Sequence, residues 1–221
     1  MLAVAIALSY LVGAVSFPYL VGRAYGVDLR GVGSRKLGGS NLAKSVGFVQ
    51  GVAGGFLDAA KGFAVVVTAR ALGFPLETQL ACGMAALVGQ MWPVFHGFDG
   101  GRANATGWGF ALAADPIAAL IMGVPLYVSL AVYPFVRPRP TRLLPVASLL
   151  SFAIFPAVIW EQEGVTPTVL AGVAMFALIV LRRVTAGLRD DLATGAPRAR
   201  VLANRVLYDR SEQQERGVVA I

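Results

Sequence analysis

Three polar clusters hold the residues of this chain that could do chemistry. The first, "GSRKLGGSNLAKSVG" (33–47), contains four glycines, three serines, one asparagine, three cationic residues and no acidic residue. Glycine lets the backbone approach a ligand closely. Backbone N–H groups, together with the side chains of Ser34 and Asn41, can then cradle an anion. Arg30 and Lys44 add positive charge, for which phosphate is a natural partner. Taken alone, the segment also fits an ordinary basic loop of a membrane protein.

The second cluster is "DAAKG" (58–62), which lies within an apolar stretch. Asp58 and Lys61 are three positions apart, so they share one face of a helix. Charged side chains inside a membrane span are costly, and they indicate a functional site by default. The alternative is a structural ion pair that holds helices together.

The third cluster is "GQMWPVFHGFDGGRANATGWG" (89–109), in which a glycine turn and an arginine precede a short apolar segment. The N-terminus of a helix starting there would offer free N–H groups to an anion. The candidate residues of this cluster are Gly100, Gly101, Arg102, Asn104 and Thr106.

The chain contains one histidine, His96, and one cysteine, Cys82. A single histidine at a membrane edge is more often structural than catalytic, although its unperturbed pKa would suit proton transfer. Cys82 lies in an apolar run and is expected to be a core thiol. No cluster has the ligand spacing of a metal site, so none is predicted.

The composition is that of a protein with several membrane spans. Of 221 residues, 57% are hydrophobic and only 14% are charged, and the mean hydropathy is +0.68. A soluble domain is usually about half apolar and a quarter charged. The net charge of +7 comes from residues in loops and the tail, so membrane topology explains it better than nucleic-acid binding does.

The hydrophobic pattern predicts an all-α integral membrane protein with seven transmembrane helices, one of them short. A span needs about 20 apolar residues. The short span, 105–114, is the uncertain one, because it could also be a half-span or an interfacial loop. The predicted spans are 2–22, 49–70, 79–95, 105–114, 117–136, 143–160 and 166–181.

Charge predicts the orientation of these spans. Cytoplasmic loops carry an excess of Lys and Arg. With the N-terminus outside and seven crossings, the basic loops 23–48, 97–104 and 137–142 and the tail all become cytoplasmic. If 105–114 did not cross, Arg137, Arg139 and Arg142 would lie outside. The charge pattern therefore favours seven crossings and a cytoplasmic C-terminus.

The chain divides into one membrane domain, 1–185, and a polar tail, 186–221. Within the tail, "DLATGAPRAR" (191–200) has the composition of a flexible connector. The segment "VLANRVLYDRSEQQER" (201–216) fits either a short amphipathic helix on the membrane surface or a disordered tail.

The three clusters, in this order and spacing, resemble the PlsY-type acyl-phosphate:glycerol-3-phosphate acyltransferases from the first span to about residue 195. The family's first motif, approximately D-I-R, then G-S-G-N-x-G-A-T-N, then a basic residue, appears as 28–30, 33–41 and Lys44. Its second motif, D-x-x-K-G, is intact at 58–62. The third motif and a later arginine-containing motif align with Gly89, Gln90, Pro93, Phe98, Gly100, Gly101, Arg102, Ala103, Ala105 and Thr106, and with Arg182 and Arg189.

The resemblance implies a multi-pass enzyme of the bacterial inner membrane, with its active site facing the cytoplasm. Such enzymes move a fatty acyl group from acyl phosphate to glycerol 3-phosphate, giving lysophosphatidic acid and phosphate, without a cofactor or metal. Ser34, Lys61 and Arg102 are then expected to be catalytic. The expected substrate-binding residues are Arg30, Gly33, Asn41, Lys44, Asp58, Gly100, Gly101, Asn104, Thr106, Arg182 and Arg189.

The chain departs from the family pattern at several positions. Gln90 and Arg183 replace motif histidines, and Ala186 replaces an asparagine. Arg35 and Lys36 replace the G-N pair of the first motif, Arg102 replaces a lysine, and Ala103 replaces a glycine. Two alternatives to the family activity therefore stay open: a paralogue that binds phosphorylated lipid without turnover, and an acyltransferase with a different phosphorylated acceptor.

Overall fold

The described part of the chain is built from helices alone. The computed structural model describes residues 1–136 and 143–208, and no strand occurs among them. The expected all-α fold class is therefore confirmed. The helices are α1 (Leu2–Ala14), α2 (Phe17–Ala24), α3 (Gly39–Ser45), α4 (Phe48–Ala71), α5 (Leu76–Met91), η1 (Val94–His96), α6 (Asn104–Ala114), α7 (Pro116–Met122), α8 (Val124–Val132), α9 (Leu143–Glu163), α10 (Pro167–Thr185), α11 (Leu188–Leu192), α12 (Arg198–Ala203) and η2 (Asn204–Tyr208).

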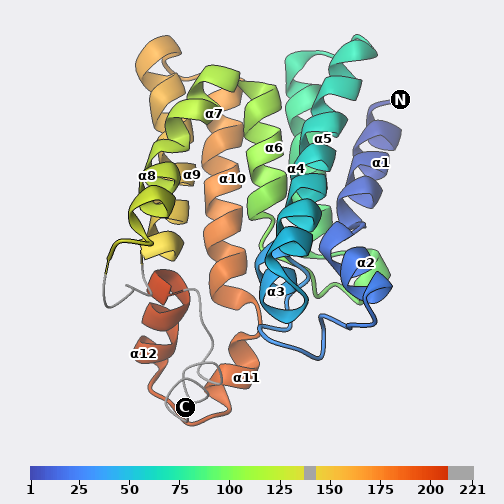
Figure 1. The fold of residues 1–221 in the computed structure, drawn as a ribbon. Coiled ribbons are helices and arrows are strands. Elements are labelled where there is room, and N and C mark those ends of the chain that lie inside the picture. The colour runs from blue at the N-terminus through green and yellow to red at the C-terminus, as the bar shows by residue number, and fades with distance from the viewer. Residues whose placement is uncertain (137–142, 209–221) are drawn as a thin grey trace.

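The long helices form a bundle with a polar layer at one end. In Figure 1, α1, α4, α5, α6, α9 and α10 run side by side, whereas α2, α3, α11 and α12 gather at the lower end. The core between the long helices consists of fully buried apolar side chains, among them Phe110 of α6, Phe152 and Phe155 of α9 and Met175 of α10. The sequence clusters at 33–47 and 89–109 both reach the polar end.

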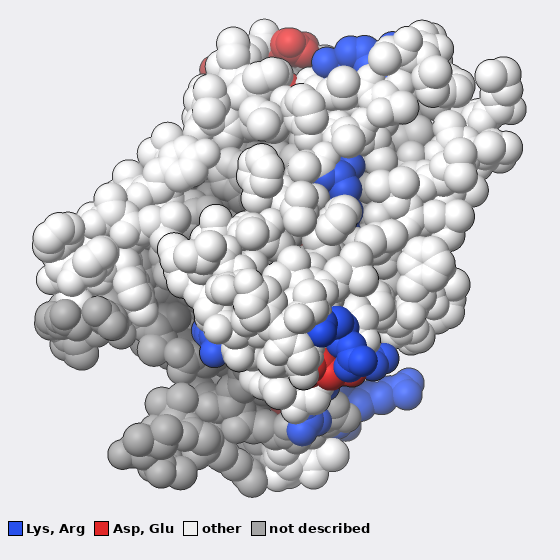
Figure 2. Space-filling view, turned by 45° about the vertical axis from the view of Figure 1, so that its right-hand side comes forward, with Lys and Arg blue, Asp and Glu red and all other residues white. Residues whose placement is uncertain are grey.

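The outside of the bundle is apolar. Phe56 and Ile117 are 70% and 66% exposed, as suits side chains that face lipid rather than water. In Figure 2 the wall between the two ends is mostly white, and much of the blue surface lies at the lower end. Four helical stretches are long and apolar enough to cross a membrane: Leu2–Ala24, Phe48–Ala71, Leu143–Glu163 and Pro167–Thr185.

The predicted first span, 2–22, is broken into two helices. α1 ends at Ala14, and α2 begins at Phe17 after Ser16, whose hydroxyl accepts a hydrogen bond from the N–H of Tyr19 (3.3 Å). Pro18 has no N–H with which to continue the ladder to Ala14, so the helix stops there. The break leaves backbone carbonyl groups available to other partners.

The predicted span 117–136 is also broken, into α7 and α8, which meet at Gly123. Pro125, near the start of α8, cannot donate the hydrogen bond that would join the two helices. The predicted short segment 105–114 is helical, as α6. The number of crossings nevertheless stays a prediction, because within residues 1–136 and 143–208 four stretches have the length and hydropathy of complete spans.

The first part of the tail folds against the polar end of the bundle. Val201 of α12 is fully buried, and Arg205 of η2 is paired with Asp191 of α11 (2.5 Å), with both side chains at most 5% exposed. The segment 191–200 therefore links two docked helices. Residues 209–216 of the predicted surface helix, and the 137–142 loop with its three arginines, lie outside the described residues.

Glycine allows α4 and α6 to pack closely, and this contact holds the polar clusters together. A Cβ atom on Gly109 would overlap the carbonyl oxygen of Ala59, and one on Gly62 would overlap that of Thr106. Both obstacles are backbone atoms, which cannot rotate aside as a side chain can.

Replacing Gly109 by alanine should therefore force α4 and α6 apart. We expect Gly109→Ala to lower the free energy of unfolding by about 1–3 kcal/mol, the usual cost of overpacking. Thermal unfolding of the purified protein in detergent measures the change. Gly55→Ala is the matched control, because a Cβ there meets nothing within 4 Å. An equal effect of both variants would contradict the close contact.

Candidate active site

Lys61 of α4 lies at the centre of a buried polar network. Its ammonium donates to the carbonyl oxygens of Gly13 (2.9 Å) and Val15, at the break between α1 and α2, and to the amide oxygen of Gln90. It also forms an ion pair with Asp58 (2.9 Å), and both side chains are at most 4% exposed. A buried charge is tolerated only when it is paired and hydrogen-bonded, and this one is both.

Gln90 of α5 joins both members of that ion pair. Its Nε2 donates to Asp58 Oδ2 (2.8 Å) and to the carbonyl oxygen of Leu37 (3.2 Å), while its Oε1 accepts from Lys61. A neutral amide offers both a donor and an acceptor, so it satisfies an anion and a cation together. The network therefore links α1, α4, α5 and the first polar loop without an imidazole.

Asn41 of α3 organises the first polar loop in a similar way. Its Oδ1 accepts from the N–H of Ser34 (3.0 Å), and its Nδ2 lies within 3.1–3.2 Å of the carbonyl oxygens of Leu29, Val32 and Lys36. Gly33 has φ +55 and lies against the Asn41 side chain, where a Cβ would collide with it. The contacts of Asn41 are those of a residue that shapes the loop.

A cavity of about 270 Å³, the helix pocket, opens between α3, α4 and the start of α6. Its cationic residues are Lys36 and Arg102, and glycines leave much of its wall as bare backbone. No side chain caps the N-terminus of α6 at Ala103, and Asn104 Oδ1 is buried without a hydrogen-bond partner among the described residues. A helix N-terminus beside two cations suits an anion. The lining residues are Lys36, Gly38, Gly39, Ser40, Gly51, Gly55, Asp58, Gln90, Gly101, Arg102, Ala103, Asn104 and Ala105.

A second cavity, the loop pocket, has a volume of about 290 Å³ and lies between the first polar loop, the η1 turn and the folded tail. Four of its lining residues are permanently or normally cationic, and two are acidic. One acid, Asp191, is already paired with Arg205. The pocket is lined by Arg30, Ser34, Arg35, Lys36, His96, Asp99, Ala186, Gly187, Asp191 and Arg205.

Titratable groups around the loop pocket are tuned by their neighbours. Hydrogen bonds from Arg30 hold the pKa of Asp28 well below its usual range. Burial, together with the nearby Arg30, lowers the pKa of His96 below 6.5, so its imidazole is neutral at pH 7. His96 also packs edge-on against Tyr19, with ring centroids 4.6 Å apart, which favours a structural role.

Arg182 of α10 holds the glycine turn of the third cluster from behind. Its guanidinium donates to the carbonyl oxygens of Gly100 (3.1 Å) and Gly101 (3.2 Å) and to Asp99 (2.7 Å). It is buried and lines neither pocket. Its contacts therefore favour positioning of the segment that carries Arg102 over direct contact with a ligand.

The other predicted residues differ in whether they line a pocket. Ser34 and Arg30 line the loop pocket, whereas Asp58, Gly101, Arg102 and Asn104 line the helix pocket. Lys44, Arg189 and Thr106 line neither; the first two are exposed, and Thr106 is buried between helices. Gly100 packs on Pro93, within the turn behind Arg102. Arg183, at a motif histidine position, donates to the carbonyl oxygen of Pro145 (3.0 Å).

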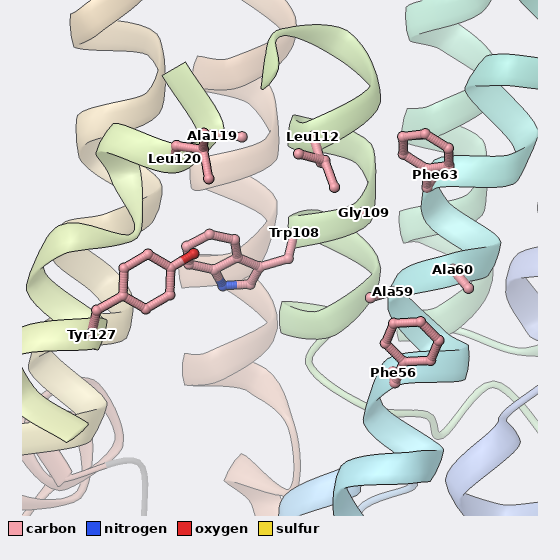
Figure 3. A pocket seen from close by; sticks show the side chains of 10 residues that line it. All are labelled: Phe56, Ala59, Ala60, Phe63, Trp108, Gly109, Leu112, Ala119, Leu120 and Tyr127. Carbon is pink, nitrogen blue, oxygen red and sulfur yellow. The ribbon is translucent and has the colours of Figure 1, made fainter. Parts of the chain in front are cut away.

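An apolar groove of about 370 Å³ lies along α4 and α6, next to the turns that line the helix pocket. In Figure 3 the ring of Trp108 on α6 lies beside that of Tyr127 on α8, with ring centroids 5.9 Å apart, and the phenyl rings of Phe56 and Phe63 lie on the α4 side. The helix pocket and the groove occupy consecutive turns of the same helix faces, because residues spaced by three or four share a face. On α4 these are Gly51, Gly55, Ala59 and Phe63, and on α6 Ala105, Trp108, Gly109 and Leu112.

Some residues of these cavities were absent from the predicted site. Lys36 and Asp99 lie within the first and third sequence clusters. The positive charge of Lys36 in a glycine-rich loop was a signal that it could belong to the site. Arg205 is in the tail, and only the long-range packing of η2 brings it to the loop pocket. The aromatic walls of the groove have the composition of any membrane helix, and no local pattern distinguishes them.

Removing one partner of the buried ion pair tests the network. We expect Asp58→Asn to leave the Lys61 ammonium without a counter-charge and to lower the free energy of unfolding by about 3–5 kcal/mol. Thermal unfolding in detergent is the measurement. Asp28→Asn is the matched control, because Asp28 pairs with Arg30 at the exposed surface and its loss should leave the unfolding temperature almost unchanged. Similar shifts in both variants would contradict a stabilising role for the buried pair.

Comparisons with known proteins agree with this geometry. The family model described as glycerol-3-phosphate acyltransferase matches residues 3–189. The chain is 34% identical over 203 residues to glycerol-3-phosphate acyltransferase 4 of Dehalococcoides mccartyi, covering 91% of this chain and 85% of that protein. It is 39% identical over 186 residues to glycerol-3-phosphate acyltransferase of an Anaeromyxobacter species, covering 81% of this chain and 87% of that protein.

A solved structure gives the same result. The crystal structure of PlsY (YgiH), an integral membrane glycerol 3-phosphate acyltransferase, in its glycerol 3-phosphate form superposes with a TM-score of 0.73 at 28% identity. The match covers 88% of this chain and 92% of that one. Together with the four apolar helical stretches, this likeness indicates an integral membrane protein. The chain belongs to the glycerol-3-phosphate acyltransferase family.

Proposed function

We propose that this protein is a membrane acyltransferase of phospholipid synthesis, which moves a fatty acyl group from acyl phosphate to glycerol 3-phosphate. The products are lysophosphatidic acid and phosphate. The observation that carries this proposal is that the cationic helix pocket and the apolar groove lie on adjacent turns of the same faces of α4 and α6. Such a site fits a ligand with a phosphate head and a long apolar tail, as an acyl phosphate has.

The two pockets suit the two substrates. The acyl chain of the donor lies in the apolar groove, and its phosphate lies in the helix pocket beside Arg102 and the N-terminus of α6. Glycerol 3-phosphate, which is soluble, enters the loop pocket at the polar end, where Ser34 and Arg30 form part of the wall. Separate sites also limit the repulsion between two phosphate groups.

The reaction then needs correct positioning and charge stabilisation. A glycerol hydroxyl oxygen attacks the acyl carbonyl carbon, the bond from that carbon to the phosphate oxygen breaks, and the phosphate leaves with the bonding electrons. The hydroxyl proton passes to the departing phosphate. Arg102 and the N–H groups of α6 stabilise the charge that develops on the leaving phosphate. Holding both substrates in adjacent pockets brings the reacting atoms close together. Lys61 contributes indirectly, because its hydrogen bonds fix the positions of the helices.

The proposed location is the bacterial inner membrane, with the N-terminus outside and the site at the cytoplasmic face. The cationic loop residues and the docked tail share one end of the bundle, as the positive-inside rule requires for a cytoplasmic end. Seven crossings, with α6 as a short one, keep the basic loops 23–48 and 97–104 and the tail on that side.

Turnover by the purified protein tests the activity. With acyl phosphate and glycerol 3-phosphate, we expect release of phosphate together with an equal amount of lysophosphatidic acid. Arg102→Ala should lower kcat by about 100-fold or more, the usual effect of removing one stabilising donor from a developing charge. Arg198→Ala is the matched control, because Arg198 is an exposed tail arginine that lines neither pocket.

Each contrary result points to a different alternative. A wild-type protein that binds lysophosphatidic acid but releases no phosphate would be a non-catalytic paralogue. Turnover with another phosphorylated alcohol, but not with glycerol 3-phosphate, would identify a different acceptor. Equal losses in Arg102→Ala and Arg198→Ala would remove Arg102 from the reaction.

Thiol labelling tests the orientation. In a Cys82→Ser background, Glu163→Cys places a thiol at the α9–α10 connection and Arg198→Cys places one at the opposite end of the bundle, both at exposed positions. A membrane-impermeant maleimide should label Glu163→Cys in intact spheroplasts, and Arg198→Cys only after lysis. The reverse labelling pattern would show the opposite orientation.

A further inference from the structure

Lys36 is the one residue, among the described residues, that lines both polar cavities. It belongs to the helix pocket together with Arg102, and to the loop pocket together with Ser34 and Arg35. Its side chain is only 13% exposed, although it lies in a polar loop. Lys36 therefore contributes to the walls of both cavities.

Both ends of Lys36 are held in place. The Asn41 side chain donates to its carbonyl oxygen (3.1 Å), which fixes the backbone. Its ammonium is 3.5 Å from Asp99 Oδ1, and that same oxygen accepts from Arg182 (2.7 Å). A side chain that is already held loses little conformational freedom when it binds a ligand.

The acid that faces Lys36 is shared with a second cation. Asp99 faces it with a side chain that is 64% exposed and shared with Arg182, so solvent weakens this pairing. Asp191, the other acid of the loop pocket, is paired with Arg205. The charged or titratable groups that face Lys36 or line its two pockets are Arg30, Arg35, Asp58, His96, Asp99, Arg102, Arg182, Asp191 and Arg205.

We propose that Lys36 is a substrate-contacting residue that bridges the two phosphates, one in the helix pocket and one in the loop pocket. This inference rests on the function proposed above. Two phosphate groups in neighbouring cavities repel each other, and a shared ammonium between them offsets that repulsion while drawing the substrates together. The ammonium keeps its protons throughout, so the transfer step itself is unchanged.

The family motif described above has asparagine at the position of Lys36. The proposed bridge therefore depends on a residue at which this chain departs from the motif. An asparagine can hydrogen-bond to a phosphate, but it carries no charge. Substituting Lys36 by asparagine therefore removes the charge and keeps a residue that the motif accommodates.

A comparison of neighbouring cations in the loop tests the bridge. We expect Lys36→Asn to raise the KM for acyl phosphate and the KM for glycerol 3-phosphate by about 10-fold each, as for the loss of a charge-assisted contact. Arg35→Asn is the matched control, because Arg35 lines the loop pocket alone and should raise only the KM for glycerol 3-phosphate. Arg35 has φ +55, a conformation that asparagine tolerates.

The pH dependence of activity separates a bridging Lys36 from a purely structural one. Burial lowers the pKa of Lys36 below 10.5; Asp99 opposes this shift, and Arg182 and Arg102 add to it. Because the cationic form bridges the phosphates, activity should fall as the pH rises through this lowered pKa. Lys36→Arg should keep turnover but lose this alkaline decline, because arginine stays charged.

Binding measurements test the bridge even if the protein shows no turnover. The same variants are titrated with glycerol 3-phosphate and with an unreactive acyl phosphonate, and their unfolding temperatures are recorded. Lys36→Asn should weaken both ligands in a protein that is still folded. Weakening of only one ligand, or an unchanged alkaline decline in Lys36→Arg, would overturn the bridge. Absence of turnover in the wild type, with both ligands weakened by Lys36→Asn, would instead count against the proposed function alone.

Discussion

The arrangement of the site depends on the buried ammonium of Lys61. A buried cation must find several acceptors, and this one has four, from three parts of the chain. The carbonyl oxygens come from the break between α1 and α2, the carboxylate comes from α4 itself, and the amide comes from Gln90 of α5. Because Gln90 also binds the carbonyl oxygen of Leu37, the same network fixes the first polar loop. The same network therefore sets both the packing of the helices and the position of the first polar loop.

Several motif residues support the cavities without forming their walls. Asn41 shapes the loop that carries Ser34 and Lys36, and Arg182 holds the turn that leads to Arg102. The cations at the cavity walls are thus carried on segments whose backbone carbonyls and N–H groups are themselves bonded. Preorganisation of this kind lets charge act on a ligand without first being reoriented.

The parts of the fold that depend on local pattern could be predicted from the sequence. The helices around 49–70, 143–160 and 166–181, and the short helix at 105–114, follow from runs of apolar residues. The division of the first span at Val15 could not be predicted from hydropathy. Pro18 allows a break there, but the break matters because it frees carbonyl oxygens that accept hydrogen bonds from Lys61, which is far along the chain. Docking of Arg205 onto the end of α10 likewise depends on tertiary packing.

The departures from the family motifs form a consistent pattern in the structure. Gln90 supplies one donor and one acceptor to a buried ion pair, and a neutral amide meets both needs without any proton transfer. Arg183 bonds to the carbonyl oxygen of Pro145, and Arg205 reaches the carbonyl oxygens of Ala186 and Gly187, where the family pattern has a neutral side chain. Arg183 and Lys36 are thus cations where the motif has histidine and asparagine, and each has a carbonyl oxygen or an acid as a partner. Since both proposed substrates carry phosphate, this exchange preserves the requirement that the cavities attract anions, while it changes which residues meet that requirement.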